Sequence, residues 1–208
     1  MVLEDKVRKL KKFIKSLAHF KIVKPCIPYD HMGATITDAL LQAGIRWETA
    51  VKLRVEKLKK LYPEAKTSSG FLKLLESKGA NKLLQWSGQE KLKRILDITR
   101  FFVAEGIETE ADLKAWFESR IDAEERLKRL RGIGNKTADY FKMLCGIPTS
   151  AVDRHLMEFL KKAGIDTESY SEAREVIHKC AEQMGLNETL LNHSIWRYMS
   201  ERGRKLCK

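Results

Sequence analysis

Two residues of this sequence, Lys136 and Asp153, have side chains whose types and positions suggest chemistry. Lys136 follows the stretch Gly-Ile-Gly-Asn at residues 132–135, and Asp153 lies 17 residues further along the chain (153 − 136). A lysine at the start of a helix, partly shielded from water, has its neutral amine favoured over the ammonium form. A neutral amine is a nucleophile, and a nearby carboxylate stabilises developing positive charge. The pair therefore suggests that the protein catalyses a reaction and does not only bind a ligand.

The glycines before Lys136 predict a tight turn between two helices. A polar helix is expected at residues 123–130, and a second helix is expected from Asn135 until Gly146 ends it. Two glycines so close together allow the backbone to adopt positive φ at both positions. The amides at the start of the second helix suit a DNA phosphate. The residues predicted to contact DNA here are Gly132, Gly134, Asn135 and Thr137.

Apolar residues recur at helical spacing along most of the chain, and the sequence contains only four prolines. This pattern predicts an all-α fold. Thr109, with Asp112 three residues later, is expected to cap a helix, as are Asp122 and Asn187. The expected helices include residues 37–43, 47–61, 82–86, 89–105 and 154–162.

The chain of 208 residues carries a formal net charge of +12 and has a sequence pI near 9.5. A charge of this size favours nucleic acid or an acidic membrane surface as a partner. A lysine-rich solubilising surface would give the same composition. The charge alone therefore favours nucleic acid over an ordinary metabolic role without identifying the partner.

Four cysteines are scattered through the chain and form no Cys-x-x-Cys pair. Neither a zinc site nor a disulfide framework is predicted, so the thiols are expected to be free in a reducing compartment. No apolar run approaches membrane-spanning length, and no signal peptide is recognised. A soluble, cytoplasmic protein with no membrane partner is expected.

The segment around Lys136 resembles the helix-hairpin-helix and the following Asp loop of the endonuclease III superfamily of DNA glycosylases. Members with lyase activity have a Gly-hydrophobic-Gly-x-Lys-Thr-Ala pattern and then a Val-Asp-x-His turn. Residues 132–138 (GIGNKTA) and 152–155 (VDRH) match these motifs. The close resemblance covers roughly residues 130–156, whereas residues 40–63 and 86–105 are similar only in helix order, and the ends match weakly.

The resemblance implies two helical lobes with the hairpin at the cleft between them, where DNA binds. The first lobe would be a central helical barrel at residues 33–150, and the second would combine residues 1–32 with 151–208. It also implies an alkali ion, Na⁺ or K⁺, held by the hairpin carbonyls of Leu130 and Gly132. Relatives of the endonuclease III type end in four cysteines that hold an iron–sulfur cluster. Only Cys207 lies near this C-terminus, so no cluster is expected.

The resemblance also implies the reaction, which is excision of a damaged base from double-stranded DNA by a monomer. The nucleotide must first leave the base stack. Asp153 would stabilise positive charge on the sugar, and Lys136 would form a Schiff base that allows elimination of the 3′ phosphate. Relatives that only remove a base usually lack this lysine, so a glycosylase with abasic-site (AP) lyase activity is predicted.

The implied substrate is an oxidised base, either 8-oxoguanine or an oxidised pyrimidine. The 8-oxoguanine glycosylases without a cluster also end in a Trp-containing helix and a basic tail, similar in outline to residues 195–208. Aromatic side chains can stack on an extruded base, and Trp196 and Phe141 are the candidates. Gln42 and Arg46 fall near the strand-invading loop of the family, and Lys91 is a candidate phosphate contact.

Other interpretations are compatible with the same residues. Hairpins of this type also serve as DNA clamps without chemistry, in which Lys136 would be one phosphate contact among many. Asp153 could simply cap the helix at residues 154–162. A glycosylase without lyase activity, acting on alkylated, deaminated or mismatched bases, is a third reading.

Overall fold

The structure is a computed structural model that describes residues 1–45 and 47–205. Every regular element in these ranges is a helix, which confirms the predicted all-α fold. None of these helices is long and apolar enough to cross a membrane. The elements are α1 (Leu3–Ser16), α2 (Met32–Leu41), the π-helix η1 (Trp47–Val51), α3 (Lys52–Leu61), the 3₁₀-helix η2 (Pro63–Lys66), α4 (Ser68–Lys78), α5 (Ala80–Leu84), α6 (Gln89–Ala104), α7 (Glu110–Ser119), α8 (Ala123–Lys128), α9 (Asn135–Leu144), α10 (Arg154–Lys162), α11 (Tyr170–Gln183) and α12 (Glu188–Lys205).

The chain folds into two compact units. One unit is the continuous segment Ile27–Ile147, and the other combines Met1–Cys26 with Pro148–Lys208. The unit boundaries therefore fall after Cys26 and Ile147, whereas the boundaries predicted from the sequence are after residues 32 and 150. Lys136 belongs to the continuous unit and Asp153 to the other.

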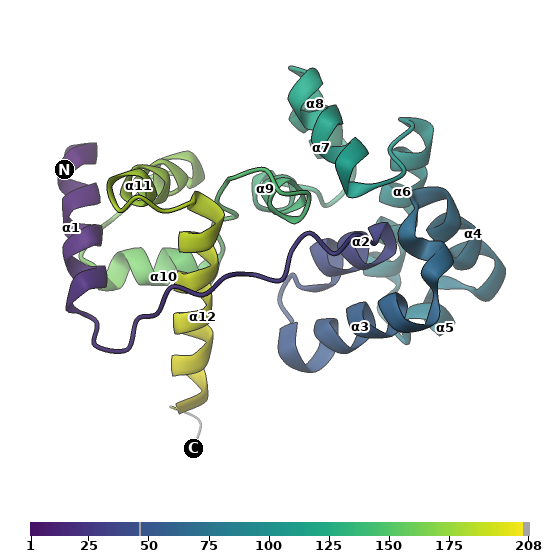
Figure 1. The fold of residues 1–208 in the computed structure, drawn as a ribbon, viewed down its shortest axis with the longest axis horizontal. Coiled ribbons are helices and arrows are strands. Elements are labelled where there is room, and N and C mark those ends of the chain that lie inside the picture. The colour runs from purple at the N-terminus through teal and green to yellow at the C-terminus, as the bar shows by residue number, and fades with distance from the viewer. Residues whose placement is uncertain (46, 206–208) are drawn as a thin grey trace. The chain divides into compact units, whose positions relative to one another are not determined.

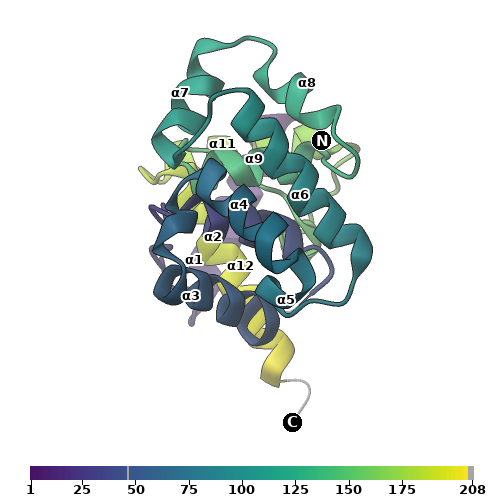
Figure 2. The same cartoon turned by 90° about the vertical axis from the view of Figure 1, so that its right-hand side faces the viewer.

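The continuous unit is built around α2, all ten residues of which are buried. Helices α3, α4, α6 and α9 pack against it, and Figure 2 shows α3, α4 and α6 around α2. Seven of the ten residues of α2 are apolar or glycine, which explains why the helix occupies the centre. The core around it includes Ile36, Leu41, Phe71, Ile95, Phe102 and Phe141.

The second unit joins the N-terminal helix to the last three helices. In Figure 1, α1 lies beside α11 and α12 packs against α10, as their residue contacts confirm. Its core includes Leu10, Leu156, Phe159, Val176, Ile177 and Ile195. The buried Lys6 ties α1 to α11, because its Nζ donates to the Asp166 carbonyl at 2.7 Å and forms an ion pair with Glu172.

Two of the three predicted caps are confirmed. Thr109 and Asp112 form a capping box at the start of α7. The amide of Thr189 donates to Oδ1 of Asn187 at 2.9 Å, at the start of α12. Asp122 occupies the N-cap position of α8, but its side chain makes no capping hydrogen bond, so that prediction is wrong in its chemistry.

Candidate functional site

The hairpin is a short turn between α8 and α9. Gly132 adopts φ +82° as predicted, and a Cβ there would lie 2.5 Å from the guanidinium carbon of Arg94. The turn is closed by the amide of Ile133, which donates to the Leu130 carbonyl at 3.1 Å. Gly134 has φ −111° and ψ −175°, so the expectation of a second positive φ is wrong. Its conformation is extended, which any residue can adopt.

Helix α9 begins at the predicted residue, and its first turn has no side-chain cap. Gly134 is the N-cap residue, and its carbonyl accepts hydrogen bonds from the amides of Thr137 and Ala138, each at 3.0 Å. The exposed Asn135 side chain accepts a hydrogen bond from Nζ of Lys128 at 3.2 Å. The first amides of a helix have no acceptor within the helix, so an N-cap without a side chain suits an external anion.

Lys136 is the second residue of α9 and is partly buried. Its Nζ lies 4.9 Å from the ring centroid of Tyr140, one turn further along the same helix. An ammonium over an aromatic face is attracted by the negative face of the ring. This contact stabilises the Lys136 side chain at the start of α9, directly after the hairpin.

A buried carboxylate that was not predicted from the sequence shares the contact residue Tyr140 with Lys136. Asp38 is 0% exposed and accepts three hydrogen bonds. Its Oδ2 accepts from the hydroxyls of Tyr29 at 2.8 Å and Tyr140 at 2.9 Å. Its Oδ1 accepts from Nε1 of Trp47 at 2.9 Å. The signal available in the sequence was that Asp38 is the one charged residue of the segment 32–41.

The environment of Asp38 acts on its protonation in two directions. Burial raises the pKa of the Asp38 carboxyl above its ordinary value, whereas its hydrogen bonds and the charge of Lys136 act in the opposite direction. Burial dominates because removing a charge from water is costly. The tryptophan N–H and both tyrosine hydroxyls can donate, so the three groups can stabilise the ionised acid despite its burial. The Lys136 ammonium is then its electrostatic counterpart.

Lys91 caps the end of α2. Its Nζ donates to the carbonyls of Leu41 and Ala43, each at 2.6 Å, and lies 5.4 Å from the ring centroid of Trp86. Burial lowers the pKa of Lys91, and the charges of Arg94 and Lys136 lower it further. Lys91 therefore has a capping role that was not predicted from the sequence, and its charge is also influenced by that of Lys136.

Gln42 is the C-cap residue of α2 and is partly buried. Its Nε2 is buried without a hydrogen-bond partner in the part of the chain that the structure describes. Arg46, the second candidate of this loop, lies outside the described residues. The prediction that both residues fill the space left by an extruded base stays a prediction.

Asp153 is the N-cap residue of α10. Its Oδ1 accepts hydrogen bonds from the amides of His155 at 2.9 Å and Leu156 at 3.0 Å. The capping role is therefore confirmed, while the catalytic role stays a prediction. Both hydrogen bonds are made to Oδ1, so the cap holds that oxygen at the start of α10.

The two aromatic candidates for stacking differ in exposure. Phe141 is 0% exposed and packs edge-on against Phe102, with ring centroids 5.4 Å apart. It is a core side chain rather than a stacking surface, which corrects the expectation. Trp196 is partly buried in α12 and stacks on His193, with ring centroids 5.8 Å apart.

The cysteines and the hairpin carbonyls are candidate ligands for an ion. Burial raises the pKa of the Cys145 thiol to about 12 and that of Cys180 to about 11, so both are thiols near neutral pH. Within residues 1–45 and 47–205 no group of three or more His, Cys, Asp or Glu side chains could hold a metal ion. The carbonyl of Leu130 already accepts the turn hydrogen bond, and the alkali ion stays a prediction.

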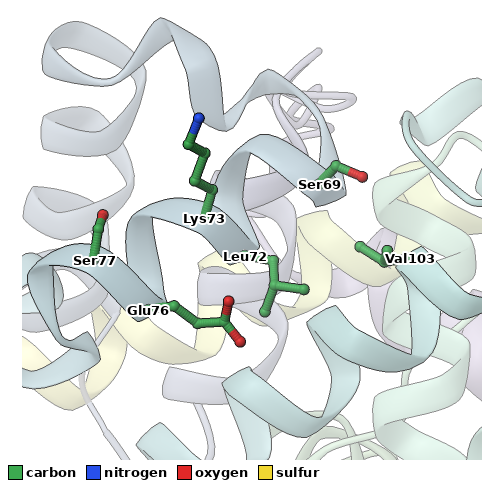
Figure 3. A pocket seen from close by; sticks show the side chains of 6 residues that line it. All are labelled: Ser69, Leu72, Lys73, Glu76, Ser77 and Val103. Carbon is green, nitrogen blue, oxygen red and sulfur yellow. The ribbon is translucent and has the colours of Figure 1, made fainter.

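A surface pocket of about 440 Å³ lies on α4 and α6. Figure 3 shows the side chains that line it. None of its residues was predicted as a site residue, and the hairpin contributes none. The lining residues are Ser69, Leu72, Lys73, Glu76, Ser77 and Val103.

Comparison with solved structures places this all-α fold in a known structural class. The fold is similar to that of the H. pylori 3-methyladenine DNA glycosylase MagIII bound to 1,N6-ethenoadenine, with a TM-score of 0.67. The match covers 97% of this chain and 99% of the other, at 21% sequence identity. At that identity the likeness is one of fold.

The sequence profile that matches the chain is described as a domain of unknown function (DUF8548), and it spans residues 11–200. The chain belongs to this family. A search of curated proteins found no match.

Proposed function

We propose that this protein is a DNA glycosylase of base excision repair that also cleaves the DNA strand through Lys136. The observation that carries the proposal is the position of Lys136, which is the second residue of α9 directly after the hairpin turn, over the Tyr140 ring. The likeness of the fold to that of a DNA glycosylase, over 97% of this chain, supports it.

The proposed partner is double-stranded DNA with a damaged base, bound by a monomer. A phosphate would accept hydrogen bonds from the first amides of α9, next to the exposed Gly132, Gly134 and Asn135. The net charge of +12 would strengthen binding and make it depend on salt.

In the proposed reaction the damaged nucleotide leaves the duplex, because its C1′ cannot be reached in the stack. Nζ of Lys136 bonds to C1′ as the glycosidic bond breaks, and the base leaves with the bonding electrons and takes up a proton. Nζ then loses a proton, the C1′–O4′ bond opens, and O4′ takes up a proton, which gives a protonated imine. Loss of a C2′ proton expels the 3′ phosphate and cleaves the strand.

Asp153 is assigned the stabilisation of positive charge on the sugar while the base departs. The amides of α10 hold its Oδ1, so the carboxylate would not need to reorganise during the reaction. Asp153 can cap α10 and stabilise positive charge on the sugar with the same side chain.

The substrate class has two candidates. An oxidised base is the class implied by the lysine motif. An alkylated base, removed without strand cleavage, is favoured by the likeness to a 3-methyladenine glycosylase bound to 1,N6-ethenoadenine. Duplexes that carry 8-oxoguanine, thymine glycol, uracil, 3-methyladenine or 1,N6-ethenoadenine would distinguish the classes by the base released and by whether the strand is cut.

Borohydride trapping tests the covalent step. The full chain, incubated with an abasic or damaged duplex and borohydride, should form a covalent adduct that Lys136→Gln abolishes. Lys93→Gln is the matched control, because it removes one exposed lysine of α6 and should leave the adduct intact.

The outcomes separate the classes of function. Base release without an adduct would mean a glycosylase that lacks lyase activity. DNA binding with neither an adduct nor base release on any duplex would overturn the proposal in favour of a non-catalytic clamp.

A further inference from the structure

Asp38 is placed where a purely structural residue would be unexpected. It is the one charged side chain in the fully buried helix α2. Burying a carboxylate is costly unless it is hydrogen-bonded and electrostatically compensated. An apolar residue would fill such a core position at lower cost, so the acid needs a reason to be there.

The three donors to Asp38 come from three separate segments. Tyr29 precedes α2, Trp47 begins η1, and Tyr140 lies in α9, 102 residues away in sequence. Each aromatic ring is therefore fixed at its polar end by the same carboxylate. Of the three, Tyr140 also contacts Lys136, through the face of its ring.

Within the part of the chain that the structure describes, charged groups on α2 and α6 act on the Lys136 ammonium. Asp38 on α2 attracts it, and Lys91 on α6 repels it. Tyr140, on the same helix as Lys136, contacts both the ammonium and the Asp38 carboxylate. The hydroxyl of Tyr140 binds the acid while its ring supports the amine.

We propose that Asp38 is a positioning residue for Lys136, which holds the Tyr140 ring under the amine and supplies the buried negative charge that stabilises the protonated imine. The inference rests on the proposed function, because it requires Lys136 to react. The nitrogen attacks as a neutral amine, is neutral again after it loses a proton, and becomes the cation of the protonated imine when the C1′–O4′ bond opens. A fixed negative charge in a buried site stabilises a cation that appears there.

The same charge predicts a specific pH dependence. A nearby carboxylate favours the ammonium form of a lysine and so raises its pKa. Removing that charge should move the rise of the trapping rate with pH to lower pH, because the neutral amine then forms at lower pH. The plateau rate should fall, because the protonated imine loses its counter-charge and the Tyr140 ring under the amine loses its hydrogen bond to the carboxylate.

The test is single-turnover borohydride trapping on an abasic duplex, with the full chain, over a range of pH. Asp38→Asn should lower the plateau rate roughly 10- to 100-fold, as displacement of a reacting group does, and shift the midpoint to lower pH. Tyr140→Phe keeps the ring but loses the hydroxyl, and should lower the plateau rate by a smaller factor.

Glu110→Gln is the matched control. Glu110 is also a buried acid that binds α2, through the His31 amide at 2.8 Å and the Thr35 hydroxyl at 2.7 Å, but it belongs to α7. Its substitution should change folding stability without changing the pH midpoint of trapping.

The outcomes for this inference and for the proposed function are distinct. If the unaltered protein forms no adduct, the proposed function fails. If it forms the adduct, and Asp38→Asn and Glu110→Gln have the same plateau rate of trapping and the same pH midpoint, the inference is overturned. Should Asp38→Asn not fold, Tyr140→Phe decides, since an unchanged plateau rate in that variant would exclude the positioning role.

Discussion

The helices that carry Lys136 and Asp153 begin in opposite ways. Helix α9 starts from Gly134, which has no side chain to bind the first amides. Helix α10 starts from Asp153, whose carboxylate accepts hydrogen bonds from two amides of its own first turn. An uncapped N-terminus keeps its amides and partial positive charge for an external anion, whereas a capped one uses them internally. The difference is consistent with the proposed phosphate binding at α9 and the proposed electrostatic role of the Asp153 carboxylate at α10.

The largest effect is expected at Asp153, where the cap and the proposed chemistry can be separated. Asparagine caps a helix about as well as aspartate, so Asp153→Asn should leave the free energy of unfolding within about 0.5 kcal/mol. Base release should nevertheless fall roughly 100-fold or more, because the negative charge that stabilises the sugar cation is gone. Single-turnover base release and denaturant unfolding measure the two effects.

Asp153→Ala is the companion variant. It removes cap and charge together, so it should lose activity and also about 1 kcal/mol of stability. Full activity in Asp153→Asn would mean that Asp153 is only a cap, and the contrast between the two helices would then be structural alone.

A smaller effect is expected when α9 is made to begin like α10. Gly134 has an extended conformation, and a Cβ there would meet nothing within 4 Å, so a side chain fits. Gly134→Asp should add a cap and a favourable charge to α9, and raise stability by about 0.5–1 kcal/mol. Affinity for duplex DNA should fall roughly tenfold, which corresponds to about 1.4 kcal/mol.

Gly134→Ser separates the cap from the charge in that experiment. It should stabilise α9 in the same direction, with a smaller loss of affinity because no negative charge is added. DNA affinity and denaturant unfolding are measured for both variants. If Gly134→Asp binds DNA as tightly as the unaltered protein, phosphate does not bind at the start of α9.

What the sequence predicted correctly is mostly local. The start of α9 at Asn135, the positive φ of Gly132 and the cap by Asp153 each depend on residues within a few positions of one another. Glycine, proline and capping residues act on the backbone beside them, so a single sequence contains the whole signal.

What the sequence could not predict depends on contacts between distant segments. The acid Asp38 is bound by side chains at positions 29, 47 and 140, and no periodicity relates these positions. Phe141 and Lys136 are five positions apart in α9, yet the Phe141 ring lies in the core and the Lys136 side chain is only partly buried. Packing decides which face of a helix is accessible, and pattern alone did not separate stacking rings from core rings.

The smallest effect concerns a third helix N-terminus, that of α2, which is capped by a group that titrates. Nδ1 of His31 accepts from the Ala34 amide at 3.1 Å, and Nε2 lies 3.1 Å from the Tyr62 carbonyl, so the neutral ring fits with its proton on Nε2. Burial lowers the pKa of His31 below 6.5, although its hydrogen bonds to the backbone oppose this. Below that pH the unfolded chain binds more protons than the folded one, so stability is lost as the pH falls.

Protonation of His31 should therefore make α2 begin like α9, without a side-chain cap. We expect the unaltered protein to lose up to about 1 kcal/mol relative to His31→Asn when the pH falls from about 7.5 to about 5.5, because asparagine keeps a cap that does not titrate. Denaturant unfolding of both proteins at the two pH values measures this difference. The lowered pKa of His193, which is due to burial, is common to both proteins and cancels in the comparison. If the free energy of unfolding of the two proteins changes with pH in parallel, then His31 stays neutral over this range or its cap contributes nothing to stability. The comparison of capped and uncapped helix N-termini would then apply to α9 and α10 alone.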